Sequence, residues 1–212
     1  MTARPDDQWG ATEFSAMAAD GLFAIYSGAT ATAARTLWTV LESMTGTFPG
    51  AIAIDDGQFV LSYRDLLTAA RQAGDRLASL GIGAGDRIGI RITPASAELY
   101  VFILAVLSVG AAYVPVDIDD PDHRAELAWS AAGVRAVIDD RGELTWRTGR
   151  HRRSPARRPV PEDDAWIIFT AGPAGMPEGV AVTHGDAAAF VDATASLFLP
   201  ARLSAGARGH ET

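Results

Sequence analysis

Short apolar segments alternate with longer helical segments along most of this chain, and that alternation restricts the fold more than any other feature. Three of the apolar segments are Arg87–Ile92, Ala111–Val116 and Val134–Ile138. Helical patterns of about ten to fifteen residues separate them, a spacing typical of strand–helix–strand units. Parallel strands need crossover connections of this length, usually helices. The sequence therefore predicts an α/β fold with a mostly parallel sheet covered by helices on both faces.

Local signals predict where several of these elements begin and end. Ser62 and Ser96 precede helical patterns and are good N-cap residues, because a serine hydroxyl accepts a hydrogen bond from an exposed amide of the first turn. Gly46 and Gly81 follow helical patterns and predict their ends. Two short strands, 51–54 and 59–61, are expected around the turn that contains Gly57.

Composition excludes several classes of function. The chain has 212 residues, 48% of them hydrophobic, which is typical of a globular protein. A net charge of −8 argues against nucleic-acid binding, and no apolar segment is long enough to predict a membrane span. There is no cysteine and no secretory signal, so we expect a cytoplasmic protein without disulfides. All 18 basic residues are arginine, so no reaction that needs a lysine can run on this chain alone.

The segment 169–180 is a loop with regularly placed glycines, after an expected buried strand at 165–169. An open glycine backbone lets phosphate approach amide hydrogens, and Thr170 adds a hydroxyl. The candidate phosphate-binding residues are Thr170, Gly172, Gly175 and Gly179. Other positions carry Pro173, Ala174 and Glu178, which supply no donor or repel phosphate. The alternative interpretation is a turn whose glycines serve only the backbone.

Three stretches together resemble one family. Leu61–Leu66 (Leu-Ser-Tyr-Arg-Asp-Leu) is similar to the first core motif of adenylate-forming (AMP-binding, ANL superfamily) enzymes. Leu107–Asp117, which contains Ala-Tyr-Val-Pro-Val-Asp, resembles the second motif. The glycine loop stands where the third, phosphate-binding motif belongs. The sequence Ala-Tyr-Val-Pro-Val-Asp is most like that of the adenylation domains of nonribosomal peptide synthetases. The resemblance covers about 37–198.

The resemblance implies the first subdomain of an adenylation-domain fold, which is less than half of that fold. The substrate-pocket sheet, the ribose-binding aspartate and the C-terminal domain with its catalytic lysine have no counterpart here. The family's third motif reads Thr-Ser-Gly-Thr-Thr-Gly-x-Pro-Lys-Gly. Five residues match it: Thr170, Gly172, Gly175, Pro177 and Gly179. Four depart from it, Ala171, Pro173, Ala174 and Glu178, so the phosphate-binding motif is degenerate.

The remaining candidate residues have structural interpretations too. His184 follows a strand that we expect at the mouth of the loop, where it would polarise a bound carboxylate; the alternative is a packed or helix-capping imidazole. The aspartates between Asp117 and Asp122 lack the spacing of a calcium loop, so we expect a solvated acidic turn and no metal site. No catalytic residue is assigned.

The predicted organisation has three parts. A mobile arm is expected over 1–33, a partial adenylation-type domain over 34–200, and a solvated tail over 201–212. Within the domain, the arginine-rich segment 141–160 is expected to be an exposed connector, although a patch that binds an anion or an acidic partner is the alternative.

Two functions follow as hypotheses. The first is a non-catalytic binding or scaffold protein in specialised-metabolite biosynthesis. It would need no cofactor, and a homodimer or a protein partner, such as a biosynthetic enzyme or carrier protein, would cover the apolar face of the half-fold. The second is half of a split, AMP-forming acid-activating ligase, completed in trans, which would use ATP and Mg²⁺.

Overall fold

The computed structural model describes residues 35–147, 153–171 and 177–198. Within these ranges, residues up to Ala189 belong to one compact unit, Ala34–Ala189. The arm expected over 1–33 and the tail expected over 201–212 lie outside the described residues. No helix within the described ranges is long and apolar enough to cross a membrane.

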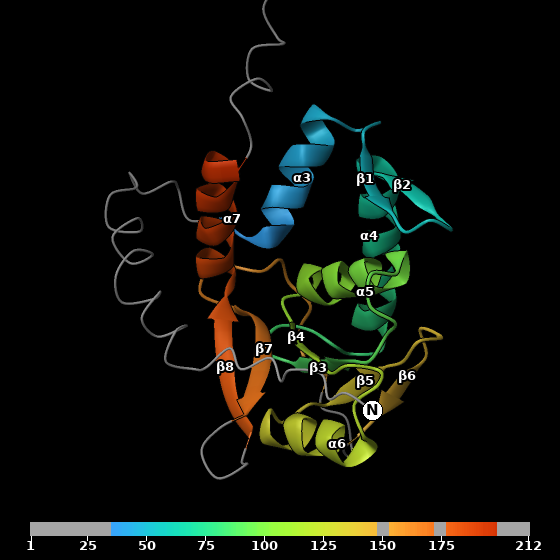
Figure 1. The fold of residues 1–212 in the computed structure, drawn as a ribbon, viewed down its shortest axis with the longest axis vertical. Coiled ribbons are helices and arrows are strands. Elements are labelled where there is room, and N and C mark those ends of the chain that lie inside the picture. Colours follow the sequence, from blue (N-terminus) through green and yellow to red (C-terminus); the bar gives the residue numbers. More distant parts are fainter. Residues whose placement is uncertain (1–34, 148–152, 172–176, 199–212) are drawn as a thin grey trace, which may run out of the picture. The chain divides into compact units, whose positions relative to one another are not determined.

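A six-stranded sheet lies at the centre of the unit Ala34–Ala189 (Figure 1). Its strands are β3 (Arg87–Ile90), β4 (Ala112–Pro115), β5 (Ala136–Ile138), β6 (Leu144–Trp146), β7 (Asp164–Ala171) and β8 (Pro177–Thr183). Their order is β6-β5-β3-β4-β7-β8. The four inner strands, β5, β3, β4 and β7, are parallel to one another. The edge strands β6 and β8 are antiparallel to β5 and β7, respectively. The prediction of a mostly parallel sheet is confirmed.

Helices cover both faces of this sheet. On one face, α4 (Tyr63–Ser79) and α5 (Ala97–Ser108) share a core with β3 and β5. On the other face, α6 (Asp122–Ala131) packs against β4 and β5. Strand β5 shows the division directly, since Ala136 and Ile138 belong to the first core and Val137 to the second. Side chains of successive strand residues point to opposite faces, so both layers are needed to bury this strand.

A smaller layer packs on the outer side of α4. Helix α3 (Leu37–Thr47) places Trp38 and Leu41 against Leu66, Leu67 and Ala70 of α4. Strands β1 (Ile52–Asp55) and β2 (Val60–Ser62) form a separate antiparallel pair, as expected around Gly57. The last helix, α7 (His184–Phe198), begins directly after β8.

The predicted serine caps are present, whereas Gly46, which was expected to end a helix, lies inside α3. The Ser62 hydroxyl accepts a hydrogen bond from the amide of Asp65, and the Asp65 carboxylate accepts one from the Ser62 amide. Ser96 accepts from the amide of Leu99 at the start of α5. Gly81 ends the α4 segment with a φ of 89°, a conformation that glycine adopts without strain.

The segment 141–160 contains a strand that the sequence interpretation missed. Strand β6 pairs antiparallel with β5, and its Leu144 and Trp146 pack against the first core. Three residues flanked by charged and glycine residues give no detectable period in the sequence. The strand forms because β5 would otherwise have an open edge beside this core.

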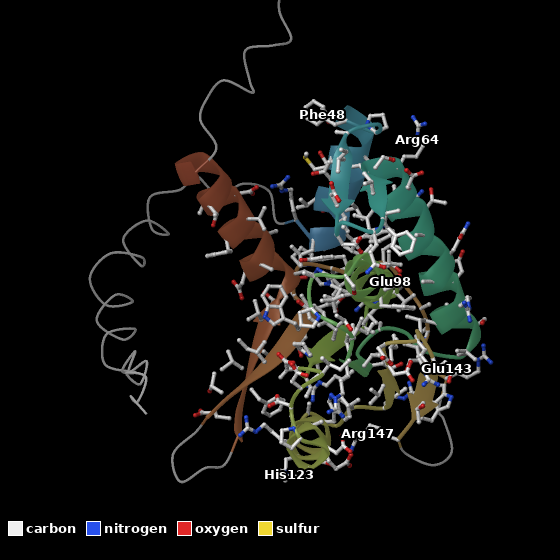
Figure 2. The ribbon with its side chains drawn as sticks, turned by 45° about the vertical axis from the view of Figure 1, so that its right-hand side comes forward. Phe48, Arg64, Glu98, His123, Glu143 and Arg147 are labelled. Carbon is white, nitrogen blue, oxygen red and sulfur yellow. The ribbon has the colours of Figure 1, made fainter. Side chains whose placement is uncertain are left out.

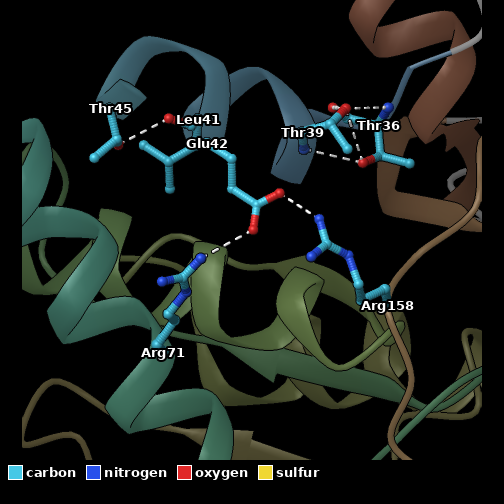
Figure 3. A network of polar contacts seen from close by, with 7 residues as sticks. All are labelled: Thr36, Thr39, Leu41, Glu42, Thr45, Arg71 and Arg158. Carbon is cyan, nitrogen blue, oxygen red and sulfur yellow. Dashed lines mark hydrogen bonds and ion pairs between the residues drawn. The ribbon is translucent and has the colours of Figure 1, made fainter. Parts of the chain in front are cut away.

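Described arginines of this segment bind other parts of the same unit. Arg147 lies beside α6, where it pairs with Glu126 at 2.5 Å (Figure 2). Arg157 pairs with Asp163 at 2.6 Å. Arg158 pairs with Glu42 of α3, and the same carboxylate also pairs with Arg71, which belongs to α4 (Figure 3). These contacts connect the segment to α3 and α6 and favour a structural role over an anion-binding patch.

A buried polar network fixes the same segment to the amino-terminal end of the sheet. The Asp86 carboxylate accepts hydrogen bonds from the amide of Gly83 and the hydroxyl of Ser154, both at 2.9 Å. Arg135 at the start of β5 pairs with Asp86 at 2.5 Å. Asp86 is only 6% exposed, so its charge depends on these partners.

We predict that Asp86→Ala destabilises the fold by about 3–5 kcal/mol, because Arg135, the amide of Gly83 and the hydroxyl of Ser154 would lose the buried carboxylate that they share. Urea denaturation followed by circular dichroism measures the change in the free energy of unfolding. The matched control is Asp120→Ala, which removes an exposed pair with Arg124 and is expected to cost less than about 1 kcal/mol. Equal losses in the two variants would contradict a structural role for the Asp86 network.

Candidate functional site

The glycine loop connects β7 and β8, which form an antiparallel hairpin at the edge of the sheet. Register pairs Ala171 with Pro177 at the end next to the loop. Gly172 and Gly175 lie outside the described residues, as do the departures Pro173 and Ala174. The structure therefore describes the two strand ends at the base of the candidate phosphate loop.

Thr170 and Glu178 face each other across this base. They are directly opposite in the register of β7 and β8, and both are exposed. Side chains in such a pair have Cβ atoms about 4.5–5.5 Å apart. The hydroxyl retained from the phosphate motif thus lies next to a carboxylate, and a carboxylate repels phosphate at this distance.

Gly179 leaves room for an aromatic ring inside the hairpin. It pairs with Phe169 in the register, and a Cβ added at Gly179 would lie 3.0 Å from Cε1 and Cζ of the Phe169 ring. The ring of Phe169 in turn packs against the core between α6 and the sheet. The Phe169 ring lies against the backbone of Gly179, so packing accounts for a glycine here without any ligand.

His184 lies at the opposite end of the hairpin from the loop. It follows β8 and comes six residues after Glu178 in an extended strand, which corresponds to about 20 Å. The expectation that His184 lies at the mouth of the loop is therefore wrong, because that expectation took no account of the length of β8. Thr170 and Gly179 come together in the hairpin, and His184 is separate from them.

The His184 ring is packed inside the protein. It is 0% exposed, and its Nδ1 accepts a hydrogen bond from the amide of Leu37, in the first turn of α3, at 3.3 Å. Its Nε2 has no hydrogen-bond partner among the described residues. Burial lowers the pKa of His184 to about 4, although the charge of Asp163 opposes this shift. The ring is therefore neutral at pH 7 and serves as an acceptor for α3.

Asp163 is a neighbour of His184 that sequence reasoning missed. Its backbone carbonyl accepts the His184 amide hydrogen at 2.9 Å. A hydrogen bond from Arg157 lowers the pKa of the Asp163 carboxyl. The acidic run before β7 carried no motif, and only the tertiary contact identifies this residue.

A hollow of about 400 Å³ lies elsewhere, at the carboxyl end of β3. None of Thr170, Gly179 and His184 lines it. Asp56 contributes to its wall and also accepts hydrogen bonds from the amides of Phe59 and Ala97, which lower the pKa of Asp56. The carboxylate of Asp56 thus helps to cap α5, a contact that the turn sequence alone did not reveal.

The aspartate-rich turn before α6 is organised by an arginine. Arg91 donates to the carbonyl oxygens of Ile118 and Asp120 and pairs with Asp122 at 2.6 Å. Within the described part of the chain, no group of three or more histidine, aspartate or glutamate residues is arranged to hold a metal ion.

A family model described as AMP-binding enzyme matches residues 41–206. The chain belongs to this family. Its first two motifs lie at β2–α4 and α5–β4, and the third lies at the β7–β8 hairpin.

Relatives of this family member include nonribosomal peptide synthetase proteins. The chain is 38% identical over 164 residues to the probable non-canonical nonribosomal peptide synthetase CymA of Salinispora arenicola, covering 68% of this chain and 2% of CymA. It is 35% identical over 170 residues to the L-proline--[L-prolyl-carrier protein] ligase of Pseudomonas fluorescens, covering 68% of this chain and 34% of the ligase.

A solved structure shares the fold. The N-terminal subdomain of NpsA from Klebsiella oxytoca, in complex with 3-hydroxyanthranilyl-AMSN, superposes with a TM-score of 0.62 at 28% identity. The match covers 71% of this chain and 41% of the NpsA chain. This AMP-binding family member thus spans less than half the length of the NpsA subdomain, and at most about a third of the two enzymes above.

We predict that Gly179→Ala destabilises the hairpin by about 1 kcal/mol, because its new methyl group would displace the Phe169 ring. Thermal unfolding measures the change. In a Phe169→Leu background the same substitution is expected to cost much less, since the ring has been removed. An equal cost in both backgrounds would show that Gly179 is retained for another reason.

We also predict that His184 makes stability depend on pH. The pKa of His184 is lowered in the folded state, so its contribution is complete above pH 6.5 and is lost as the pH falls towards 4. The expected loss is about 2 kcal/mol, allowing for solvent screening.

The measurement is denaturant unfolding at pH 7 and pH 4.5, compared with His184→Asn. Asparagine keeps a hydrogen-bond acceptor for Leu37 but does not titrate in this range. The wild-type chain should lose more stability than the variant between the two pH values. Identical losses would show that the buried imidazole has no part in acid sensitivity.

Proposed function

We propose that this chain acts as a non-catalytic binding or scaffold protein in nonribosomal-peptide-type biosynthesis. The observation that carries the proposal is the cross-strand pair of Thr170 and Glu178 at the base of the phosphate loop. A functional cradle of the family would place a lysine where Glu178 stands. The chain has no lysine anywhere to replace it.

Electrostatics argues against useful ATP binding at this hairpin. Each charge-assisted hydrogen bond to phosphate contributes about 1.5–3 kcal/mol. The loop has lost several such donors and has gained a carboxylate beside the remaining hydroxyl. We therefore assign no catalytic residue and no cofactor to the chain, and propose that residual anion contacts at Thr170 and the glycine amides are weak.

A binding role needs a surface, and the hairpin offers one. Ile168 and Val180 are directly opposite in the register and are 41% and 46% exposed. Apolar side chains that lie together on a sheet are stabilised when a partner covers them. We propose a partner protein in the cytoplasm: a second copy, a biosynthetic enzyme or a carrier protein.

A split enzyme is the second candidate. The chain covers 41% of the NpsA subdomain to which it is similar. In this candidate function, a second polypeptide supplies the remaining part of an AMP-forming ligase. ATP and Mg²⁺ would then bind near Thr170 and the loop amides. The burial of His184, about 20 Å from Thr170 along β8, argues against its contact with a substrate carboxylate in the described conformation.

We predict that the purified chain shows no ATP–pyrophosphate exchange with amino or aryl acids and no ATP·Mg²⁺ binding by calorimetry at micromolar concentrations. Glu178→Lys should strengthen ATP binding by about tenfold or more, because it replaces a repulsive charge with a charge-assisted donor. Glu178→Gln is the matched control, which removes the repulsion without adding a cation.

Robust exchange by the wild-type chain alone would overturn the non-catalytic proposal. Exchange that appears only after a second polypeptide with the remaining part of an adenylation domain is added would establish the split enzyme. If Glu178→Lys leaves ATP affinity unchanged, the charge at this position does not explain the loss of phosphate binding.

A further inference from the structure

We propose that two copies of this chain associate through the outer edge of β8, so that the two β8 strands lie antiparallel and join their sheets. This inference rests on the proposed binding role and names the partner as a second copy. Its basis is the geometry of β8, its sequence and the exposed pair of Ile168 and Val180.

The outer edge of β8 is open in the described part of the chain. Strand β8 is the last strand in the sheet order and pairs only with β7 there. Residues 178–181 are all exposed. An edge strand presents unpaired amide and carbonyl groups, which can form hydrogen bonds with another strand.

Strand β8 has few of the features that prevent edge pairing. Natural edges are commonly protected by lysine, proline or a bulge. The chain has no lysine, and Pro177 is only the first residue of the strand, where it leaves the rest free to pair. Glu178 is the single charged residue of β8. The register shift in this hairpin lies at its far end, between Asp164 and Trp166 of β7.

A two-fold axis through Val180 gives a register without charge conflict. Val180 would then face Val180 of the partner subunit, and Glu178 would face Val182 of the partner subunit. The two Glu178 carboxylates would lie about four residues apart along the strands, or about 14 Å. That separation exceeds the Debye length of about 8 Å at physiological ionic strength, so their repulsion is weak.

The same register brings the exposed apolar pairs of the two copies side by side. Ile168 and Val180 share one face of the hairpin because they are directly opposite. Pairing two hairpins about Val180 would produce a row of four apolar side chains across the joined sheet. An isologous contact of this kind is self-complementary and closes at two copies.

Light scattering coupled to size-exclusion chromatography tests the proposal. We expect the wild-type chain to be a dimer at tens of micromolar. Val180→Arg should weaken the dimer by about tenfold or more, because it places two like charges opposite each other at the two-fold axis. Ile168→Arg is the matched control: it changes the same face, but its two copies would lie one strand further out on each side, and the dimer should persist.

A monomeric wild-type chain would overturn the proposal. Loss of the dimer in both variants would also overturn it, since that result indicates packing through the face and not pairing through the edge. Persistence of the dimer in a folded Val180→Arg variant would show that β8 is not the interface.

Cysteine crosslinking gives a second measurement that does not depend on Val180→Arg folding. The chain has no cysteine, so Val180→Cys introduces a single thiol. Under mild oxidation it should form a covalent dimer rapidly, because the Cα atoms of opposite residues at the axis lie about 4.5–5.5 Å apart, within the range that a disulfide spans. Leu127→Cys on α6, at a position that is 55% exposed, is the control and should crosslink slowly. Equal rates would overturn the proposed register.

Pyrophosphate exchange measured on the same samples separates this inference from the proposed function. If the dimer catalyses exchange, the non-catalytic proposal is overturned but the proposed β8 interface is not. If the chain is a monomer and catalyses no exchange, the proposed β8 interface is overturned but the non-catalytic proposal is not.

Discussion

The central strands of the sheet must be shielded from water on both faces, and most of the architecture follows from that requirement. Ile88 and Ile90 of β3 and Val114 of β4 are at most 1% exposed. Strands buried in this way need a helix layer on each side, which α4 and α5 supply on one face and α6 on the other. The antiparallel strand β6 then returns the chain to the amino-terminal end of the sheet, where Ser154 lies beside Asp86.

Arginine has a structural use throughout this fold. Arg135, Arg147, Arg157 and Arg158 each pair with a carboxylate of the same unit, and Arg91 fixes the turn before α6. Guanidinium groups suit this use because they remain charged and donate in several directions. Cations in these pairs hold elements together, whereas the phosphate hairpin has Glu178 in place of a cation. The charge distribution therefore agrees with the proposed binding role and with the weak anion affinity expected at the loop.

Features with a local cause could be predicted from the sequence, and those with a tertiary cause could not. Ser62 and Ser96 were identified as caps because a serine before a helical pattern has one main use. Strand β6 was missed because its formation depends on the edge of β5. The position of His184 was predicted wrongly because it depends on how far β8 extends before α7 begins. The motifs identified the family, while the facing of Thr170 and Glu178 required the register of the hairpin.

The ring of Phe169 over Gly179 bears on how such motifs should be interpreted. Selection for an unobstructed aromatic ring and selection for nucleotide binding would preserve the same glycine. The packing of Phe169 is by itself a reason for glycine at position 179, whether or not a nucleotide binds. In relatives of this kind, the identity of the residue beside the glycine is a better indicator of surviving chemistry than the glycine itself.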